Sequence, residues 1–185
     1  LVALQDPYGI RPLSIGKLNG GYCISSETCA FPKVEGQYMF DVKPGTMVSI
    51  TLGGIKVKHF ANANEKKCRF ESIYYSHPSS MVFGENVSRF RINIGKKLEE
   101  LFPVLQADIV TPIPDSSNFI AMGYSESGRS GKYFPIIMRS HYVGRTFIAA
   151  TQAKRDLEVT QKFTFTTQEI KDKVIVVVDD SIVRA

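Results

Sequence analysis

The spacing of apolar and polar residues in the first third of the chain is typical of β-structure. Apolar and polar residues alternate at 46–52 and again at 55–60, with Gly53-Gly54 between the two runs. Alternation with a period of two predicts strands with one buried face, and glycine accepts the positive φ angles of a tight turn. We therefore predict a β-hairpin that turns at Gly53-Gly54 and directs Lys56 and Lys58 to solvent.

After a polar stretch at 61–67, the apolar residues follow a helical period. Phe90, Ile94, Leu98 and Leu101 lie on one helical face, with Asn86 or Ser88 as the cap and Pro103 after the end. Alternating strands and helices predict a parallel sheet, and the β-branched run Val174–Val178 predicts a strand buried on both faces. The fold class is therefore a β-rich part followed by an α/β part, with a domain boundary at 61–67. The remaining predicted elements are strands at 108–113 and 134–138 and a helix at 118–124.

Composition excludes several classes of protein. The chain has 185 residues, 43% of them hydrophobic, and no apolar run approaches the length of about 20 residues that spans a bilayer. The net charge of +5 is not concentrated in basic blocks, so we expect neither a nucleic-acid nor a membrane partner. Three cysteines without CxxC spacing favour a reducing compartment. We expect a soluble intracellular chain, incomplete because it begins with Leu.

Polar residues follow two of the predicted strands directly. Asp179 and Asp180 come after one strand, and Ser116 and Ser117 come shortly after another. Ligands of parallel sheets bind beyond the carboxyl ends of the strands, and carboxylate oxygens suit Mg²⁺ or a ribose diol. The alternative is that these residues only cap the helices that follow.

A basic stretch follows the predicted strand at 134–138. It carries only two acidic residues, Asp156 and Glu158, between positions 139 and 162. We interpret it either as a mobile cover over a polyphosphate or as a solvated surface loop. Its basic residues are Arg139, Arg145, Lys154, Arg155 and Lys162.

Several segments together resemble one enzyme family. VIVVVDDSIVR at 174–184 is similar to the phosphoribosyl pyrophosphate (PRPP) fingerprint of type I phosphoribosyltransferases. With YVGRTFI at 142–148, PIPDS at 112–116 and QDPYGIRPL at 5–13, the chain resembles the glutamine PRPP amidotransferases in collinear order. The resemblance implies that 1–65 are the distal part of an N-terminal-nucleophile (type 2) glutamine amidotransferase domain. It also implies that 66–185 are the N-terminal part of a type I phosphoribosyltransferase domain with a parallel sheet.

The resemblance implies an activity and a set of partners. Members of the family transfer ammonia from glutamine to PRPP and form 5-phosphoribosylamine, the first committed step of de novo purine biosynthesis. The substrates would be PRPP and glutamine, the cofactor Mg²⁺, the assembly a homo-oligomer, and the location the cytoplasm or a plastid.

By the same resemblance, Asp179, Asp180 and Ser181 would contact PRPP. Ser116 would join the two aspartates around Mg²⁺. The loop that closes over PRPP would contain Tyr142, Arg145 and Lys162.

Other positions set this chain apart from the family pattern. Cys68 matches one of the four ligands of a 4Fe–4S cluster in part of the family, and Gln5 stands where the family has Arg. The family's nucleophile is an N-terminal cysteine, but residue 1 here is Leu, so we expect these 185 residues alone to be inactive, with no catalytic residue of the glutaminase. A PRPP-binding regulator and an inactive remnant on the same fold are the alternatives.

Overall fold

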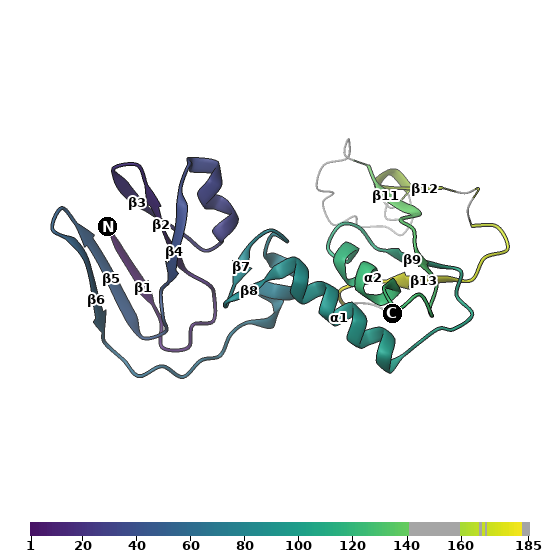
Figure 1. Cartoon of the computed structure of the whole chain (residues 1–185), viewed down its shortest axis with the longest axis horizontal. Helices are drawn as coiled ribbons and strands as arrows, with labels where there is room; N and C mark the ends of the chain where they lie inside the picture. The colour runs from purple at the N-terminus through teal and green to yellow at the C-terminus, as the bar shows by residue number, and fades with distance from the viewer. Residues whose placement is uncertain (141–159, 167, 169, 183–185) are drawn as a thin grey trace, which may run out of the picture. The chain divides into compact units, whose positions relative to one another are not determined.

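The computed structural model describes residues 1–140, 160–166, 168 and 170–182. The chain forms two compact units, Leu1–Phe90 and Arg91–Ala185 (Figure 1). Their border lies inside helix α1 (Val87–Leu101), later than the composition change at 61–67. The irregular segment 61–67 is hydrogen-bonded to the rest of the first unit, since the amides of Asn64 and Lys66 donate to the carbonyls of Pro7 and Tyr8 at 2.8 and 2.7 Å.

Most of the regular structure in the first unit is β-strand, as its alternating pattern predicts. One antiparallel sheet has the order β1-β5-β6, a second has the order β3-β2-β4, and β7 pairs with β8. The buried core joins the first two sheets: Ala3, Val48 and Ile50 come from one, and Ile15 from the other. The bounds are β1 (Val2–Gln5), β2 (Ser14–Leu18), β3 (Gly21–Ser25), the 3₁₀ helix η1 (Thr28–Val34), β4 (Gln37–Asp41), β5 (Thr46–Thr51), β6 (Gly54–His59), the π-helix η2 (Glu71–Tyr75), β7 (Met81–Val82) and β8 (Glu85–Asn86).

The predicted hairpin is confirmed, but its turn lies one residue earlier. Thr51 pairs with Gly54, so the two turn residues are Leu52 and Gly53 rather than Gly53-Gly54. Gly54 still supplies the positive φ, at 102°. The two lysines of β6 face solvent as expected, yet Val57 is also 55% exposed. Since β6 is an edge strand of its sheet, only the start of the strand packs on the core.

Two carboxylates hold the end of the first unit together. Oε2 of Glu27 accepts hydrogen bonds from the His77 amide at 2.6 Å and the Ser80 hydroxyl at 2.9 Å. Glu71 is 5% exposed and accepts from the Arg11 guanidinium and, at 3.2 Å, from the Ser76 hydroxyl. The segment 76–80 is thus anchored by charge-assisted hydrogen bonds.

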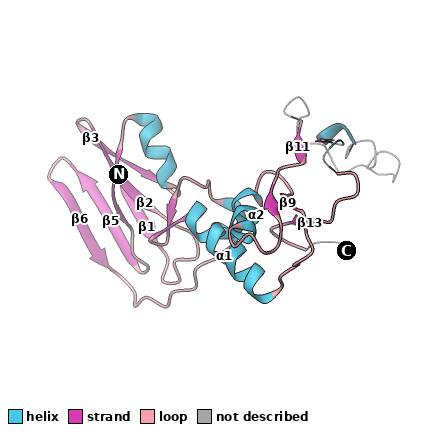
Figure 2. Cartoon of the chain, turned by 45° about the vertical axis from the view of Figure 1, so that its right-hand side comes forward, coloured by secondary structure: helices cyan, strands magenta, loops and turns pink. Residues whose placement is uncertain are grey.

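The second unit contains the predicted parallel sheet. Strand β9 (Ile109–Pro112) lies between β10 (Lys132–Tyr133) and β13 (Ile175–Val178), and both pairings are parallel. Helix α2 (Asn118–Ser125) packs on this sheet beside β9 (Figure 2). A second, antiparallel pair consists of β11 (Ile137–Arg139) and β12 (Phe163–Phe165).

Helices α1 and α2 meet at two glycines. A Cβ atom at Gly95 would lie 1.9 Å from the carbonyl oxygen of Ile120, and one at Gly123 would lie 2.0 Å from that of Ile92. This close approach allows Ile94 and Leu98 of α1 to reach the core around Val110, Ile120, Ala121, Tyr124 and Val178. The Asn86 side chain caps α1 by accepting from the Arg89 amide at 3.0 Å, as predicted.

Three predictions for the second unit need correction. Of the strand expected at 134–138, only the end is found, in β11; residues 134–136 are irregular, since Pro135 has no backbone N–H to donate to a strand ladder. Val177 is 54% exposed rather than buried on both faces, since β13 lies at the edge of the described sheet. Leu101 is 60% exposed because it lies in the last turn of α1, beyond the described sheet core.

Candidate functional site

The carboxyl edge of the parallel sheet brings two distant segments together. Val178 pairs with Pro112, and the Ile113 amide donates to the Val178 carbonyl at 2.9 Å. Both strands end at the same edge because they run in parallel. The residues that follow them, Asp179-Asp180 and Ser116-Ser117, therefore lie close in space although more than 60 positions separate them.

The two aspartates have different surroundings. Asp179 is exposed, and its Oδ1 accepts from the Ser117 hydroxyl at 3.3 Å and from the Asp180 amide at 2.8 Å. Asp180 is half-buried, and its Oδ1 accepts from the Ser181 hydroxyl at 2.8 Å. Oδ2 of Asp180 is buried and has no hydrogen-bond partner in the described part of the chain. A buried carboxylate oxygen without a donor is costly, so it favours a bound cation or a ligand hydroxyl.

Ser117, rather than Ser116, makes the contact with this carboxylate pair. Ser117 is fully buried at the N-cap position of α2, but its side chain makes no capping bond and points to Asp179 instead. Helix capping alone therefore does not explain the orientation of the Ser117 side chain. Ser116 is half-buried in the same loop, and its role as a metal ligand stays a prediction.

The oxygen donors at this edge fit Mg²⁺. Two carboxylates and a neighbouring hydroxyl match its preference for oxygen, and Mg²⁺ takes its remaining ligands from water and substrate. Within the described residues, no group of three or more His, Cys, Asp or Glu side chains could hold a metal ion by itself. Water and substrate oxygens would complete the coordination of Mg²⁺ at such a site.

A cavity of about 600 Å³ lies beside the loop that follows β9. Asp115 and Arg139 are the two charged residues among the described residues that line it, and they form an ion pair of 3.3 Å. The peptide bond between Pro114 and Asp115 is cis. Our sequence reasoning did not single out this pair, although both residues stand in segments that it had marked, PIPDS and the basic stretch.

The residues predicted for the closing loop are only partly described. Tyr142 and Arg145 lie outside the described residues. Lys162 directly precedes β12, its carbonyl accepts from the Ser140 amide at 2.8 Å, and its Nζ lies 5.3 Å from the centre of the Phe163 ring. Its contact with PRPP stays a prediction.

Cys68 is half-buried in the first unit. Its thiol is free, and its amide donates to the Ile10 carbonyl at 3.0 Å. A 4Fe–4S cluster needs four ligands, and the described residues contain no set of side chains that could supply them. The cluster therefore stays a prediction that rests on the family resemblance.

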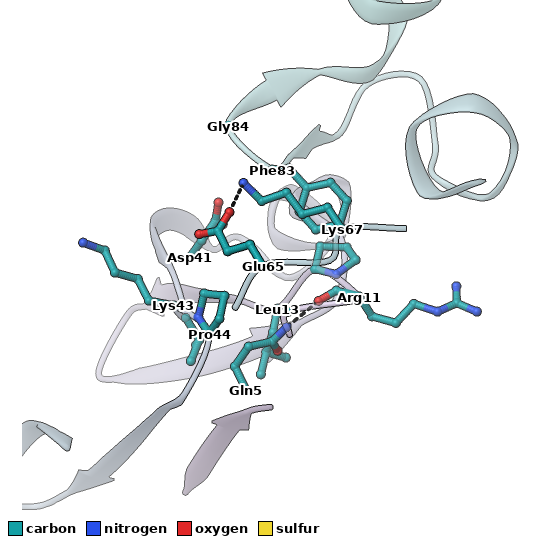
Figure 3. Close-up of a pocket in the computed structure, with 13 residues that line it drawn as sticks. Gln5, Arg11, Leu13, Asp41, Lys43, Pro44, Glu65, Lys67, Phe83 and Gly84 are labelled. Carbon is teal, nitrogen blue, oxygen red and sulfur yellow. Dashed lines mark hydrogen bonds and ion pairs between the residues drawn. The ribbon is translucent and has the colours of Figure 1, made fainter. Parts of the chain in front are cut away.

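A second cavity, of about 230 Å³, lies in the first unit (Figure 3). The QDPYGIRPL segment forms one wall, where Gln5 is buried and donates from Nε2 to the Arg11 carbonyl at 2.6 Å. The Arg11 side chain extends away from the cavity and pairs with Glu71. On the other wall, Lys67 pairs with Glu65 at 2.7 Å. Asp41 and Lys43 also line the cavity, so its lining carries charges of both signs.

Comparisons with known proteins agree with this architecture. No protein-family profile matches the chain. Amidophosphoribosyltransferases from Bacillus subtilis and Mycobacterium tuberculosis are 44% and 40% identical over the whole of this chain, which covers 38% and 34% of their lengths. A chloroplastic amidophosphoribosyltransferase from Arabidopsis thaliana is 43% identical, and the chain covers 32% of it.

Solved structures show the same correspondence. The glutamine PRPP amidotransferase from B. subtilis, complexed with ADP and GMP, has a TM-score of 0.88 and 42% identity over 98% of this chain and 40% of its own. A structure described as the allosteric regulatory enzyme of purine biosynthesis has a TM-score of 0.89 over 99% of this chain and 39% of its own. The chain thus spans about a third of the length of the curated relatives that it matches. Over its whole length the sequence is similar to part of these amidophosphoribosyltransferases, and its fold matches part of the two solved structures.

Proposed function

We propose that the protein containing this chain is an amidophosphoribosyltransferase that uses glutamine and PRPP to form 5-phosphoribosylamine, the first committed step of purine biosynthesis. The observation that carries the proposal is the pair Asp179-Asp180 at the carboxyl edge of the parallel sheet, with the unpartnered buried Oδ2 of Asp180. The names of the relatives supply the reaction.

In this proposal the second unit performs the transfer to the ribose. The nitrogen of ammonia forms a bond to C1 of the ribose while the bond from C1 to the pyrophosphate oxygen breaks, and the electron pair leaves with pyrophosphate. Asp179 and Asp180 would orient the ribose hydroxyls and, with Ser116, hold Mg²⁺, which stabilises the departing polyanion when bound. Ser181 would contact PRPP and help to position the Asp180 carboxylate, to whose Oδ1 its hydroxyl donates at 2.8 Å.

Further parts of the proposal concern organisation. The domain boundary near 65 would separate a glutaminase part from a phosphoribosyltransferase part. Tyr142, Arg145 and Lys162 would cover PRPP, Cys68 would be one ligand of a 4Fe–4S cluster, and the protein would be a homo-oligomer in the cytoplasm or a plastid. No helix in the described part of the chain is long and apolar enough to cross a membrane.

Substitution of the two aspartates tests the proposal. In the purified full-length protein, Asp179→Asn and Asp180→Asn should each lower phosphoribosylamine formation from PRPP and ammonia by roughly 100-fold, or about 3 kcal/mol in the barrier. Glutamine hydrolysis should persist. Asp172→Asn is the matched control, because Asp172 is exposed in the same unit and has a φ of 60° that asparagine tolerates. Unchanged phosphoribosylamine formation in both variants contradicts the assignment, and PRPP binding without any turnover in the wild type indicates the regulator instead.

A further inference from the structure

The cavity beside the loop after β9 contains one exposed ion pair, whose two charges balance each other. Nη1 of Arg139 lies 3.3 Å from Oδ2 of Asp115, and the two side chains are 40% and 58% exposed. The rest of the described lining is uncharged, so this guanidinium is the sole described cationic group facing the cavity. Asp115 also stands two residues before Ser117, which contacts Asp179. The loop that lines the cavity at Asp115 thus also carries the serine at the carboxylate edge.

An exposed pair of this kind is easily broken. Solvent-exposed ion pairs contribute little free energy because water screens the charges and two long side chains must be ordered. A multivalent anion can offer the guanidinium two oxygens at once, which a single carboxylate at 3.3 Å does not do here. An anion that binds the guanidinium through two oxygens competes with Asp115 for Arg139 and then lies close to that carboxylate.

We propose that Asp115 sets the affinity of this cavity for the pyrophosphate group by competing with it for Arg139. When the cavity holds no anion, Asp115 neutralises Arg139. When pyrophosphate enters, it replaces Asp115 at the guanidinium, and the adjacent negative charge of Asp115 weakens its binding. In a transferase that must release pyrophosphate after every cycle, this competition favours release. The inference rests on the proposed function, because it takes the anion to be the pyrophosphate of PRPP.

Calorimetric titration of inorganic pyrophosphate with Mg²⁺ into the purified protein tests the competition directly. Asp115→Asn should bind pyrophosphate about fivefold more tightly, the change that corresponds to the upper end of exposed ion pairs. Arg139→Gln should bind it more weakly than the wild type, and the gain from Asp115→Asn should vanish in the Arg139→Gln background. Thermal unfolding without ligand checks that each variant is folded.

A matched control separates this pair from a general effect of charge. Lys96 and Glu126 form another exposed pair of the second unit, at 2.8 Å and with side chains 40% and 55% exposed. Glu126 lines a different cavity. Glu126→Gln removes one negative charge, as Asp115→Asn does, and should leave pyrophosphate affinity unchanged.

The outcomes distinguish this inference from the proposed function. If the wild type binds pyrophosphate and Asp115→Asn binds it equally or more weakly, the competition is wrong while the function stands. A gain that persists with Arg139→Gln also overturns it, since the carboxylate would then act by repulsion alone. If neither pyrophosphate nor PRPP binds to the wild type or any variant, the proposed function fails and the inference fails with it.

Discussion

The contact between α1 and α2 leads to a quantitative prediction about Gly123. A methyl group at this position would lie 2.0 Å from the carbonyl oxygen of Ile92, 2.8 Å from its carbonyl carbon and 3.0 Å from its Cα. All three are backbone atoms of the facing helix, so no side chain can rotate away. Ordinary contacts between carbon and other heavy atoms begin at about 3.5 Å. Gly123→Ala therefore requires the two helices to separate by more than 1 Å.

The energetic cost of this separation should be large. Overpacking in a core usually costs 1–3 kcal/mol, and here the separation also loosens the contacts of Ile94 and Leu98 with the sheet. We expect Gly123→Ala to lower the free energy of unfolding by roughly 3 kcal/mol, a large part of the 5–15 kcal/mol typical of a domain. Gly95→Ala should behave similarly, since its Cβ would lie 1.9 Å from the Ile120 carbonyl oxygen.

Urea denaturation followed by circular dichroism measures the effect. Gly21→Ala is the matched control, because a Cβ at Gly21 has nothing within 4 Å and its φ is not positive. We expect this control to change the free energy of unfolding by less than about 0.5 kcal/mol. Wild-type stability in both Gly95→Ala and Gly123→Ala would show that the helices do not approach as closely as described.

Three further predictions concern stability. Glu35 has a φ of 54° at the end of η1, and asparagine tolerates this conformation better, so Glu35→Asn should raise the free energy of unfolding by about 0.5–1 kcal/mol; a decrease in chemical denaturation contradicts this. Glu27→Ala removes the acceptor of the His77 amide and should cost about 2 kcal/mol, and a melting temperature equal to that of the wild type would argue against the anchor. The pKa of Glu99 is lowered, mainly by its hydrogen bond from Arg129, so its stabilisation is present above its unfolded pKa of about 4.3 and is lost as the pH falls through the lower folded pKa. Below pH 4.3 the stability of the wild type should therefore fall more steeply than that of Glu99→Gln, and parallel pH profiles of the unfolding free energy would refute this reasoning.

Local pattern was sufficient for several of the elements and for one half of the site. Alternation specified the hairpin of β5 and β6, and the helical period specified α1 with its Asn86 cap, because each signal depends on neighbours within a few residues. A β-branched run that ends in Asp179-Asp180 likewise indicated a strand with a ligand at its end. These features follow from the sequence because backbone geometry translates residue spacing directly into faces and ends.

The tertiary structure decided which side chains meet. Parallel pairing of β9 with β13 places Ser117, rather than Ser116, against Asp179, and it leaves Oδ2 of Asp180 buried without a donor. The pair of Asp115 with Arg139 joins positions 24 residues apart. Which of two adjacent serines turns inward depends on the loop's packing against another strand. Residue spacing along one segment carries no record of that contact, because it arises only when distant segments share a sheet edge.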